Sequence, residues 1–145
     1  MSSSVTPVLN HQEVIHKVNR IAWQIYEEHY QESSIILAGI ALRGFAFAEL
    51  LAQELEKIAD LKIHLAQIEL NKKDPLSAPL KIKGLDTDYT GKSIVVIDDV
   101  LNSGSTLIYG VRYFLDYKVK SIHTAVLVDR SHKRYPVKAD FKGIS

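Results

Sequence analysis

Two short, almost wholly apolar runs constrain the fold of this chain more than any other feature. "SIILAGI" occupies residues 34–40 and "SIVVID" occupies residues 93–98. Strands of this kind are typical of a parallel sheet, where both faces are buried under helices. A segment rich in helix formers follows each run, at 43–59 and at 105–117. This alternation predicts an α/β domain, a parallel sheet flanked by helices, with 93–98 as a central strand.

The remaining elements are weaker but fit the same plan. Asn10 and Glu13 resemble a capping box, and the helical spacing of apolar residues after them predicts a helix over 11–30. Strands are predicted at 62–70 and 121–129, a loop with hairpin character at 71–84, and a basic loop over 130–141 that runs into a short strand. A length of 145 residues predicts one domain, 1–145, in which 1–9 form a loose tail.

Composition excludes several classes of function. The net charge is +1, so charge alone does not favour nucleic acid. The chain has no cysteine, which excludes disulfides, thiol nucleophiles and cysteine–zinc sites. Five of its histidines show no metal-ligand spacing: His11, His16, His29, His64 and His123. It has no apolar run of about 18 residues and no signal peptide at its start, so we expect a cytoplasmic protein without a membrane partner.

The stretch "SIVVIDDVLNSGSTL" (93–107) carries the chemistry. In an open parallel sheet, ligands bind beyond the carboxyl ends of the strands, and the predicted strand ends at Asp98 and Asp99. The next residues turn into a helix, whose free amides and dipole attract an anion. Gly104 allows close approach of a phosphate, and hydroxyl or amide side chains surround it. The predicted phosphate cradle is Asn102, Ser103, Gly104, Ser105 and Thr106.

The two aspartates would repel that phosphate unless they serve another group. They fit hydrogen bonds from sugar hydroxyls, or a metal ion. The ligand predicted from this order is a sugar phosphate with vicinal hydroxyls. The alternative is that the acid pair only forms a turn and a helix cap. Neither a Walker A motif nor a G-x-G-x-x-G fingerprint is present.

The motif "VVIDDVLNSGSTL" resembles the phosphoribosyl-pyrophosphate-binding motif of the type I phosphoribosyltransferases. "IILAGIALRGFAFAELLAQEL" is similar to the first strand, the pyrophosphate loop and the next helix of that Rossmann-like family. "TAVLVDRSHKRYPVKADFKG" is closest to the bifunctional pyrimidine operon regulators that are also uracil phosphoribosyltransferases, and bacterial hypoxanthine phosphoribosyltransferases come second.

The resemblance implies roles for residues of this chain. Asp98 and Asp99 would bind the ribose 2- and 3-hydroxyls, and with Arg43 they would form the catalytic set. The 5-phosphate would lie on 102–106. The pyrophosphate loop, which in the family often holds a strained cis peptide bond, would be Ala41, Leu42, Arg43 and Gly44. Mg²⁺ would bridge pyrophosphate and ribose oxygens, with no side chain assigned as its direct ligand.

Two further groups of residues come from the resemblance. Lys72 and Lys73 would close with the flexible loop over the site, and a C-terminal hood with Asp129, Phe141 and Lys142 would cover the nucleobase. The flexible loop carries lysines where the family usually has an arginine. We expect the hood to be short, truncated in comparison with the hoods of other family members. A homodimer or a higher homo-oligomer is expected.

Three functions remain open at this stage. The first is transfer of the 5-phosphoribosyl group of phosphoribosyl pyrophosphate to uracil, with release of pyrophosphate. The second is the same transfer to hypoxanthine or guanine. The third is a nucleotide-sensing regulator of pyrimidine genes that binds RNA and has little catalysis. Charge that suits RNA lies in the basic loop, at Arg130, His132, Lys133, Arg134 and Lys138.

Overall fold

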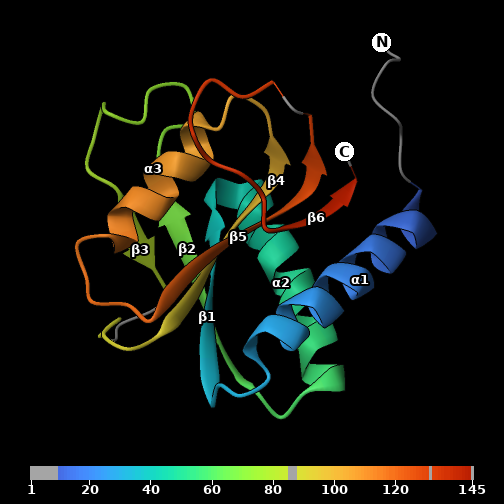
Figure 1. The fold of residues 1–145 in the computed structure, drawn as a ribbon. Coiled ribbons are helices and arrows are strands. Elements are labelled where there is room, and N and C mark those ends of the chain that lie inside the picture. The colour runs from blue at the N-terminus through green and yellow to red at the C-terminus, as the bar shows by residue number, and fades with distance from the viewer. Residues whose placement is uncertain (1–9, 85–87, 131, 145) are drawn as a thin grey trace.

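The computed structural model describes residues 10–84, 88–130 and 132–144, so the predicted tail at 1–9 lies outside the described residues. The described part forms one α/β domain (Figure 1). Its elements are α1 (His11–His29), β1 (Ser34–Ile40), α2 (Ala41–Ile58), β2 (Lys62–Glu69), β3 (Lys81–Lys83), β4 (Ser93–Leu101), α3 (Ser105–Phe114), β5 (Ser121–Asp129) and β6 (Phe141–Ile144). None of the described helices is long and apolar enough to cross a membrane.

The described strands form a six-stranded sheet in the order β3-β2-β1-β4-β5-β6. All neighbours are parallel except β3, which runs antiparallel to β2. β4 lies between β1 and β5, which confirms the predicted central place of 93–98. Its carboxyl end, with the two aspartates, therefore opens in the middle of one edge of the sheet.

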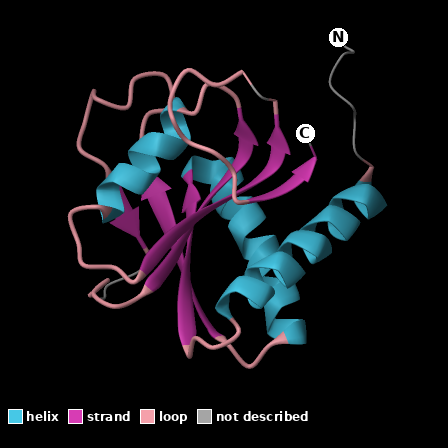
Figure 2. Cartoon of the chain, viewed as in Figure 1, coloured by secondary structure: helices cyan, strands magenta, loops and turns pink. Residues whose placement is uncertain are grey.

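Helices cover both faces of the sheet (Figure 2). α1 and α2 pack on one face, where the core includes Ile35, Leu37 and Ile97. α3 packs on the other face, against Ile36 and Val96. Alternate residues of β1 and β4 enter opposite cores, because successive side chains of a strand point to opposite faces. Both strands are therefore apolar along nearly their whole length.

Several boundaries differ from the prediction. β4 continues through both aspartates to Leu101, because Val100 and Leu101 still pair with β5. α2 begins at Ala41, two residues early, and α3 ends at Phe114 because the Leu115 amide turns back to the Arg112 carbonyl. The hairpin character of 71–84 is confirmed by β3, and the short C-terminal strand is β6.

Candidate active site

A cavity of about 510 Å³ lies at the carboxyl end of β4. It brings together the acid pair, the predicted phosphate cradle and two cations from elsewhere in the chain. The residues that line it are Arg43, Lys72, Asp98, Asp99, Val100, Leu101, Asn102, Ser103, Gly104, Ser105, Thr106 and Leu107. Seven residues predicted from sequence, Asp98, Asp99 and 102–106, therefore share one cavity with one residue of the predicted pyrophosphate loop and one of the flexible loop.

The cradle is built around Gly104, the N-cap of α3. Its φ of 90° is in the left-handed region that favours glycine. A Cβ at this position would lie 2.7 Å from the Val137 side chain, so the loop also packs closely on its far side. Within the described residues, the amides of Thr106 and Leu107 have no protein acceptor, as is usual in the first turn of a helix. These amides and the helix dipole suit an anion.

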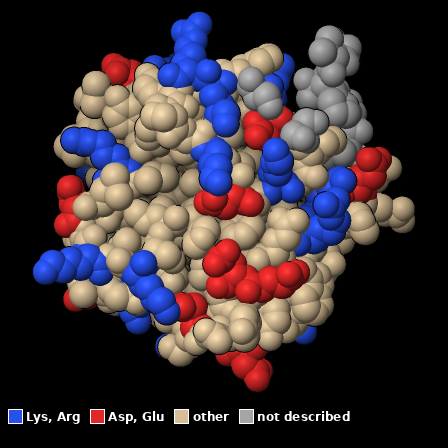
Figure 3. All heavy atoms as spheres, viewed as in Figure 1, with Lys and Arg blue, Asp and Glu red and all other residues tan. Residues whose placement is uncertain are grey.

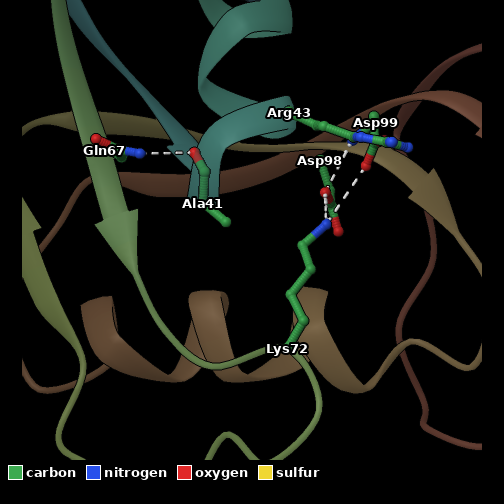
Figure 4. Close-up of polar contacts among 6 residues, drawn as sticks. All are labelled: Ala41, Arg43, Gln67, Lys72, Asp98 and Asp99. Atoms are coloured by element: carbon green, nitrogen blue, oxygen red, sulfur yellow. Dashed lines mark hydrogen bonds and ion pairs between the residues drawn. The ribbon is translucent and has the colours of Figure 1, made fainter.

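The acid pair is held together with Lys72 (Figure 4). Lys72 Nζ lies 2.9 Å from Asp98 Oδ1 and 3.4 Å from Asp99 Oδ1. The Asp98 side chain is only 3% exposed, whereas that of Asp99 is 21% exposed. The Asp99 amide donates to Asp98 Oδ1 at 2.9 Å, which fixes the buried carboxyl against the backbone.

The two carboxyls differ in acidity. Burial raises the pKa of Asp98 to about 7, and its hydrogen bond with Asp99 adds to that shift, while Lys72 opposes it. Burial also raises the pKa of Asp99, but the hydrogen bond with Asp98 and the charge of Lys72 outweigh it, so this pKa lies below its usual value. Asp98 therefore takes up a proton as pH falls through about 7, whereas Asp99 stays ionised near neutral pH.

The predicted pyrophosphate loop forms the start of α2, next to the acids. The resemblance led us to expect a strained cis peptide bond there, and this is wrong: 41–44, like the other described residues, has none. Ala41 instead has a positive φ of 55°, unusual for a residue with a Cβ. Gly44 allows α2 to approach β4, since a Cβ there would lie 2.7 Å from the Ile97 carbonyl oxygen. Leu42 is exposed.

Arg43 projects from this turn over the cavity. Its side chain is 86% exposed, and its guanidinium lies 4.0 Å from Asp99 Oδ2. An ion pair this exposed contributes little to stability. The guanidinium is therefore available to an anionic ligand.

Seven predicted site residues do not line the cavity: three of the pyrophosphate loop described above, Ala41, Leu42 and Gly44, and four from elsewhere, Lys73, Asp129, Phe141 and Lys142. Lys73 is exposed, and its amide donates to Asn71 Oδ1. The Asp129 carboxylate is buried and lies 3.8 Å from Lys142 Nζ. Phe141 is 6% exposed and belongs to the core under α1 and α2, where its ring meets those of His29 and His123. The assignment of Asp129, Phe141 and Lys142 to a nucleobase site stays a prediction.

Sequence reasoning missed one residue that supports the site. Gln67 of β2 donates from Nε2 to the Ala41 carbonyl at 2.9 Å (Figure 4), and so holds the residue with positive φ. β2 pairs with β1 directly beside this turn, with Gln67 opposite Gly39. The only sequence signal was a polar residue near the end of a predicted strand.

Comparison with known proteins decides the family. The model of the phosphoribosyl transferase domain matches residues 4–145. The chain belongs to the phosphoribosyltransferase family. The enzyme is 33% identical to the bifunctional protein PyrR of Nostoc punctiforme, over 99% of this chain and 84% of the relative. It is 34% identical to the bifunctional protein PyrR of Bacillus subtilis, over 94% of this chain and 80% of the relative.

Solved structures support the same fold. A hypoxanthine-guanine phosphoribosyltransferase from Bacillus anthracis superposes with a TM-score of 0.77 at 22% identity, covering 94% of this chain and 79% of that one. A hypoxanthine phosphoribosyltransferase from Staphylococcus aureus gives 0.78 at 19% identity, covering 97% and 77%. These similarities confirm the α/β architecture of a type I phosphoribosyltransferase.

Proposed function

We propose that this phosphoribosyltransferase transfers the 5-phosphoribosyl group of phosphoribosyl pyrophosphate to uracil and releases pyrophosphate. The observation that carries the proposal is the single cavity in which open helix amides, an acid pair and two cations meet. A phosphate, a diol and a pyrophosphate are the three polar parts of this substrate. The cavity offers a complementary group to each.

Different residues would bind the three polar parts of the substrate. The amides of Thr106 and Leu107, with the hydroxyls of 103–106, would hold the 5-phosphate at the start of α3. The carboxyls of Asp98 and Asp99 would accept hydrogen bonds from the ribose hydroxyls. Arg43, exposed above the cavity, would bind the pyrophosphate. In this arrangement the anomeric carbon would lie between the acid pair and Arg43.

The reaction is a displacement at that carbon. The bond from the anomeric carbon to the pyrophosphate oxygen breaks, and a bond from that carbon to the nucleobase nitrogen forms. The proton that this nitrogen carried is lost to solvent. Positive charge develops on the ribose ring in the transition state, and the ionised Asp99 stabilises it electrostatically. Arg43 stabilises the negative charge that builds on the leaving group.

The acid pair also fits a magnesium ion. Mg²⁺ prefers oxygen ligands and is usually bound by one or two carboxylates together with substrate phosphates. Asp98 and Asp99 offer such carboxylates, and the contact with the Lys72 ammonium shows that a cation is favourable beside them. When bound, Mg²⁺ would supply charge neutralisation at the pyrophosphate.

Uracil is proposed because of the relatives rather than the pocket. The two bifunctional PyrR proteins are 33–34% identical to this chain over nearly its whole length. The sequence stretch 124–143 resembles the bifunctional pyrimidine operon regulators that are also uracil phosphoribosyltransferases. The two purine phosphoribosyltransferases share the fold at 19–22% identity, and a likeness at this level gives no argument for a purine substrate.

The test is turnover with each base. Purified enzyme with Mg²⁺ and phosphoribosyl pyrophosphate is given uracil, hypoxanthine or guanine, and both the nucleoside monophosphate and pyrophosphate are measured. We expect both products, in equal amounts, with uracil. Turnover with a purine alone would overturn the uracil assignment. Absence of turnover with all three, together with no binding of phosphoribosyl pyrophosphate, would overturn the proposed function.

A second candidate function, RNA binding, rests on the exposed basic loop. Within the described residues, Arg130, Lys133 and Arg134 are exposed and form no ion pair. Figure 3 shows acidic and basic side chains interspersed on this face, rather than one broad basic surface. Substituting the three residues by Gln would weaken RNA binding and reduce its salt dependence if the loop contacts phosphates. An unchanged salt dependence would exclude this loop as the contact.

A further inference from the structure

Lys72 occupies the place in the cavity where the proposed substrate would put its ribose. Its ammonium lies within 3.4 Å of a carboxylate oxygen from each aspartate, at 2.9 Å for Asp98 and 3.4 Å for Asp99. Its side chain is 37% exposed, so the contact is partly shielded from solvent. Burial lowers the pKa of Lys72, but the two carboxyls outweigh burial and raise it overall. Lys72 is therefore a charged partner of the acid pair.

The backbone around Lys72 favours this contact. Lys72 follows β2 by three residues, and the amides of Lys73 and Asp74 both donate to the Asn71 side chain, at 3.0 and 3.3 Å. Such a turn restricts the chain on either side of Lys72. The lysine is thus tethered beside the cavity, while its long side chain can still point to another anion nearby.

The same contact conflicts with binding of a ribose. A carboxylate oxygen that accepts from an ammonium at 2.9 Å has less capacity for a sugar hydroxyl, and the ammonium also fills the space beside it. We infer that the Lys72 ammonium neutralises Asp98 and Asp99 when no ligand is bound, an inference that rests on the proposed function. A ligand must displace the ammonium from the two aspartates in order to bind. The displaced ammonium then binds the pyrophosphate of the substrate. Lys72 thereby determines specificity for the pyrophosphate-bearing ligand.

Binding of two ligands distinguishes displacement of Lys72 from a general attraction of anions by its charge. Phosphoribosyl pyrophosphate gives the displaced ammonium a new anionic partner, so the cost of breaking the Lys72 contacts is offset. Ribose 5-phosphate differs only in lacking the pyrophosphate, and it leaves the ammonium without one. After transfer, return of Lys72 to the acid pair would favour release of the monophosphate product.

The experiment compares the wild type with Lys72→Met by calorimetric titration at saturating Mg²⁺. We expect Lys72→Met to bind ribose 5-phosphate about tenfold more tightly and phosphoribosyl pyrophosphate about tenfold more weakly, since one charge-assisted hydrogen bond corresponds to roughly that factor. A lysine that only attracts anions predicts weaker binding of both ligands. The sign of the change for ribose 5-phosphate is therefore decisive.

Two further variants complete the test. Lys81→Met removes the same charge from β3, where the side chain is exposed and forms no ion pair within the described residues, and should leave both affinities unchanged. Lys72→Arg keeps the charge and should bind ribose 5-phosphate no more tightly than the wild type. If Lys72→Met binds ribose 5-phosphate with equal or lower affinity, or if it does not fold and Lys72→Arg binds that ligand more tightly, the inference is overturned. A wild type that binds neither ligand overturns the proposed function itself.

Discussion

The two aspartates at the end of β4 are adjacent in the chain but have different environments. Both line the cavity, but Asp98 is buried next to the start of α2, where Gly44 brings the helix backbone close to it, whereas Asp99 is more exposed and lies near Arg43. Alternation along the strand separates them, because β4 continues through both residues. One position can therefore keep a proton while the other stays ionised.

Asp98 makes stability depend on pH in a defined direction. Its pKa of about 7 in the folded state exceeds that of an ordinary aspartate, near 3.8, so the folded state binds more protons between these values. The stability that it contributes is complete below about pH 4 and is lost as pH rises through 7. We expect Asp98→Asn to gain stability relative to the wild type between pH 5 and pH 8, by at most about 2.7 kcal/mol, because only the two pH units between 5 and the folded pKa of about 7 contribute. Urea unfolding at both values measures this, and a constant difference would contradict it.

Asp99 is expected to matter for ligand rather than for folding. Asp99→Asn leaves the Lys72–Asp98 contact in place, so the melting temperature without ligand should hold. Affinity for phosphoribosyl pyrophosphate should fall about tenfold, since a hydrogen bond to a charged acceptor is worth roughly 1.5–3 kcal/mol. Asp60→Asn, an exposed change at the far end of the sheet, is the control. Loss of stability with an intact ligand response would instead indicate a structural cap.

At the scale of elements, the close approach of α2 to β4 positions the site. A Cβ at Gly44 would meet the Ile97 backbone oxygen at 2.7 Å, whereas a Cβ at Gly110 of α3 would meet only the side-chain ends of Ile40 and Val96, at 3.1 Å. Gly44→Ala should cost about 1–3 kcal/mol, as overpacking does. Gly110→Ala should stay within about 1 kcal/mol, because higher helix propensity offsets the crowding. Urea midpoints measure both, and equal losses would contradict this account.

The long elements were predictable and the short ones were less so. Residues 34–40 and 93–98 are almost wholly apolar because both their faces are buried, and this pattern is visible in the sequence alone. β3 and β6 have three and four residues, too few for a periodic pattern, and the sheet edge decides their pairing. The extension of β4 through charged residues depends on pairing with β5, which no local propensity shows.

At the scale of the whole molecule, the predictable half of the site is the half that is local in sequence. Residues 98–106 are consecutive, so one strand-to-helix turn gathers them. Gln67, which was not predicted, reaches the Ala41 carbonyl across 26 residues through the pairing of β2 with β1. Lys72 was predicted only from the family resemblance, and it contacts Asp98 of β4 across 26 residues. Phe141, which the resemblance assigns to the nucleobase hood, lies on β6 beside Ala125 and is part of the core, and its assignment to the hood stays a prediction.

A buried histidine that packs against a half-buried one should affect the stability of the whole domain in acid. His29, at the end of α1, is 2% exposed and donates from Nδ1 to the Ile25 carbonyl at 2.9 Å. Among the described residues, its Nε2 and the Nδ1 of His123 have no hydrogen-bond partner, and the two rings lie 5.1 Å apart. Burial lowers the pKa of His29, and His123 adds to this, while the Ile25 carbonyl and the charges of Glu28 and Glu32 act in the opposite direction. The folded state therefore holds His29 neutral.

This neutral histidine predicts a loss of stability in mild acid. Because the pKa of His29 is lower in the folded state than its ordinary value of 6.5, its contribution is complete above 6.5 and is lost as pH falls towards the folded pKa. His29→Leu should remove that loss, so the free energy of unfolding of the variant should rise relative to the wild type between pH 7.5 and pH 5.5. Asp98 contributes the opposite slope, but it is common to both chains and cancels in the difference. His16→Leu, an exposed change on α1, should keep the wild-type slope. Parallel curves for the wild type and His29→Leu, measured by urea unfolding at pH 5.5, 6.5 and 7.5, would show that the core accepts the charged imidazole at no cost.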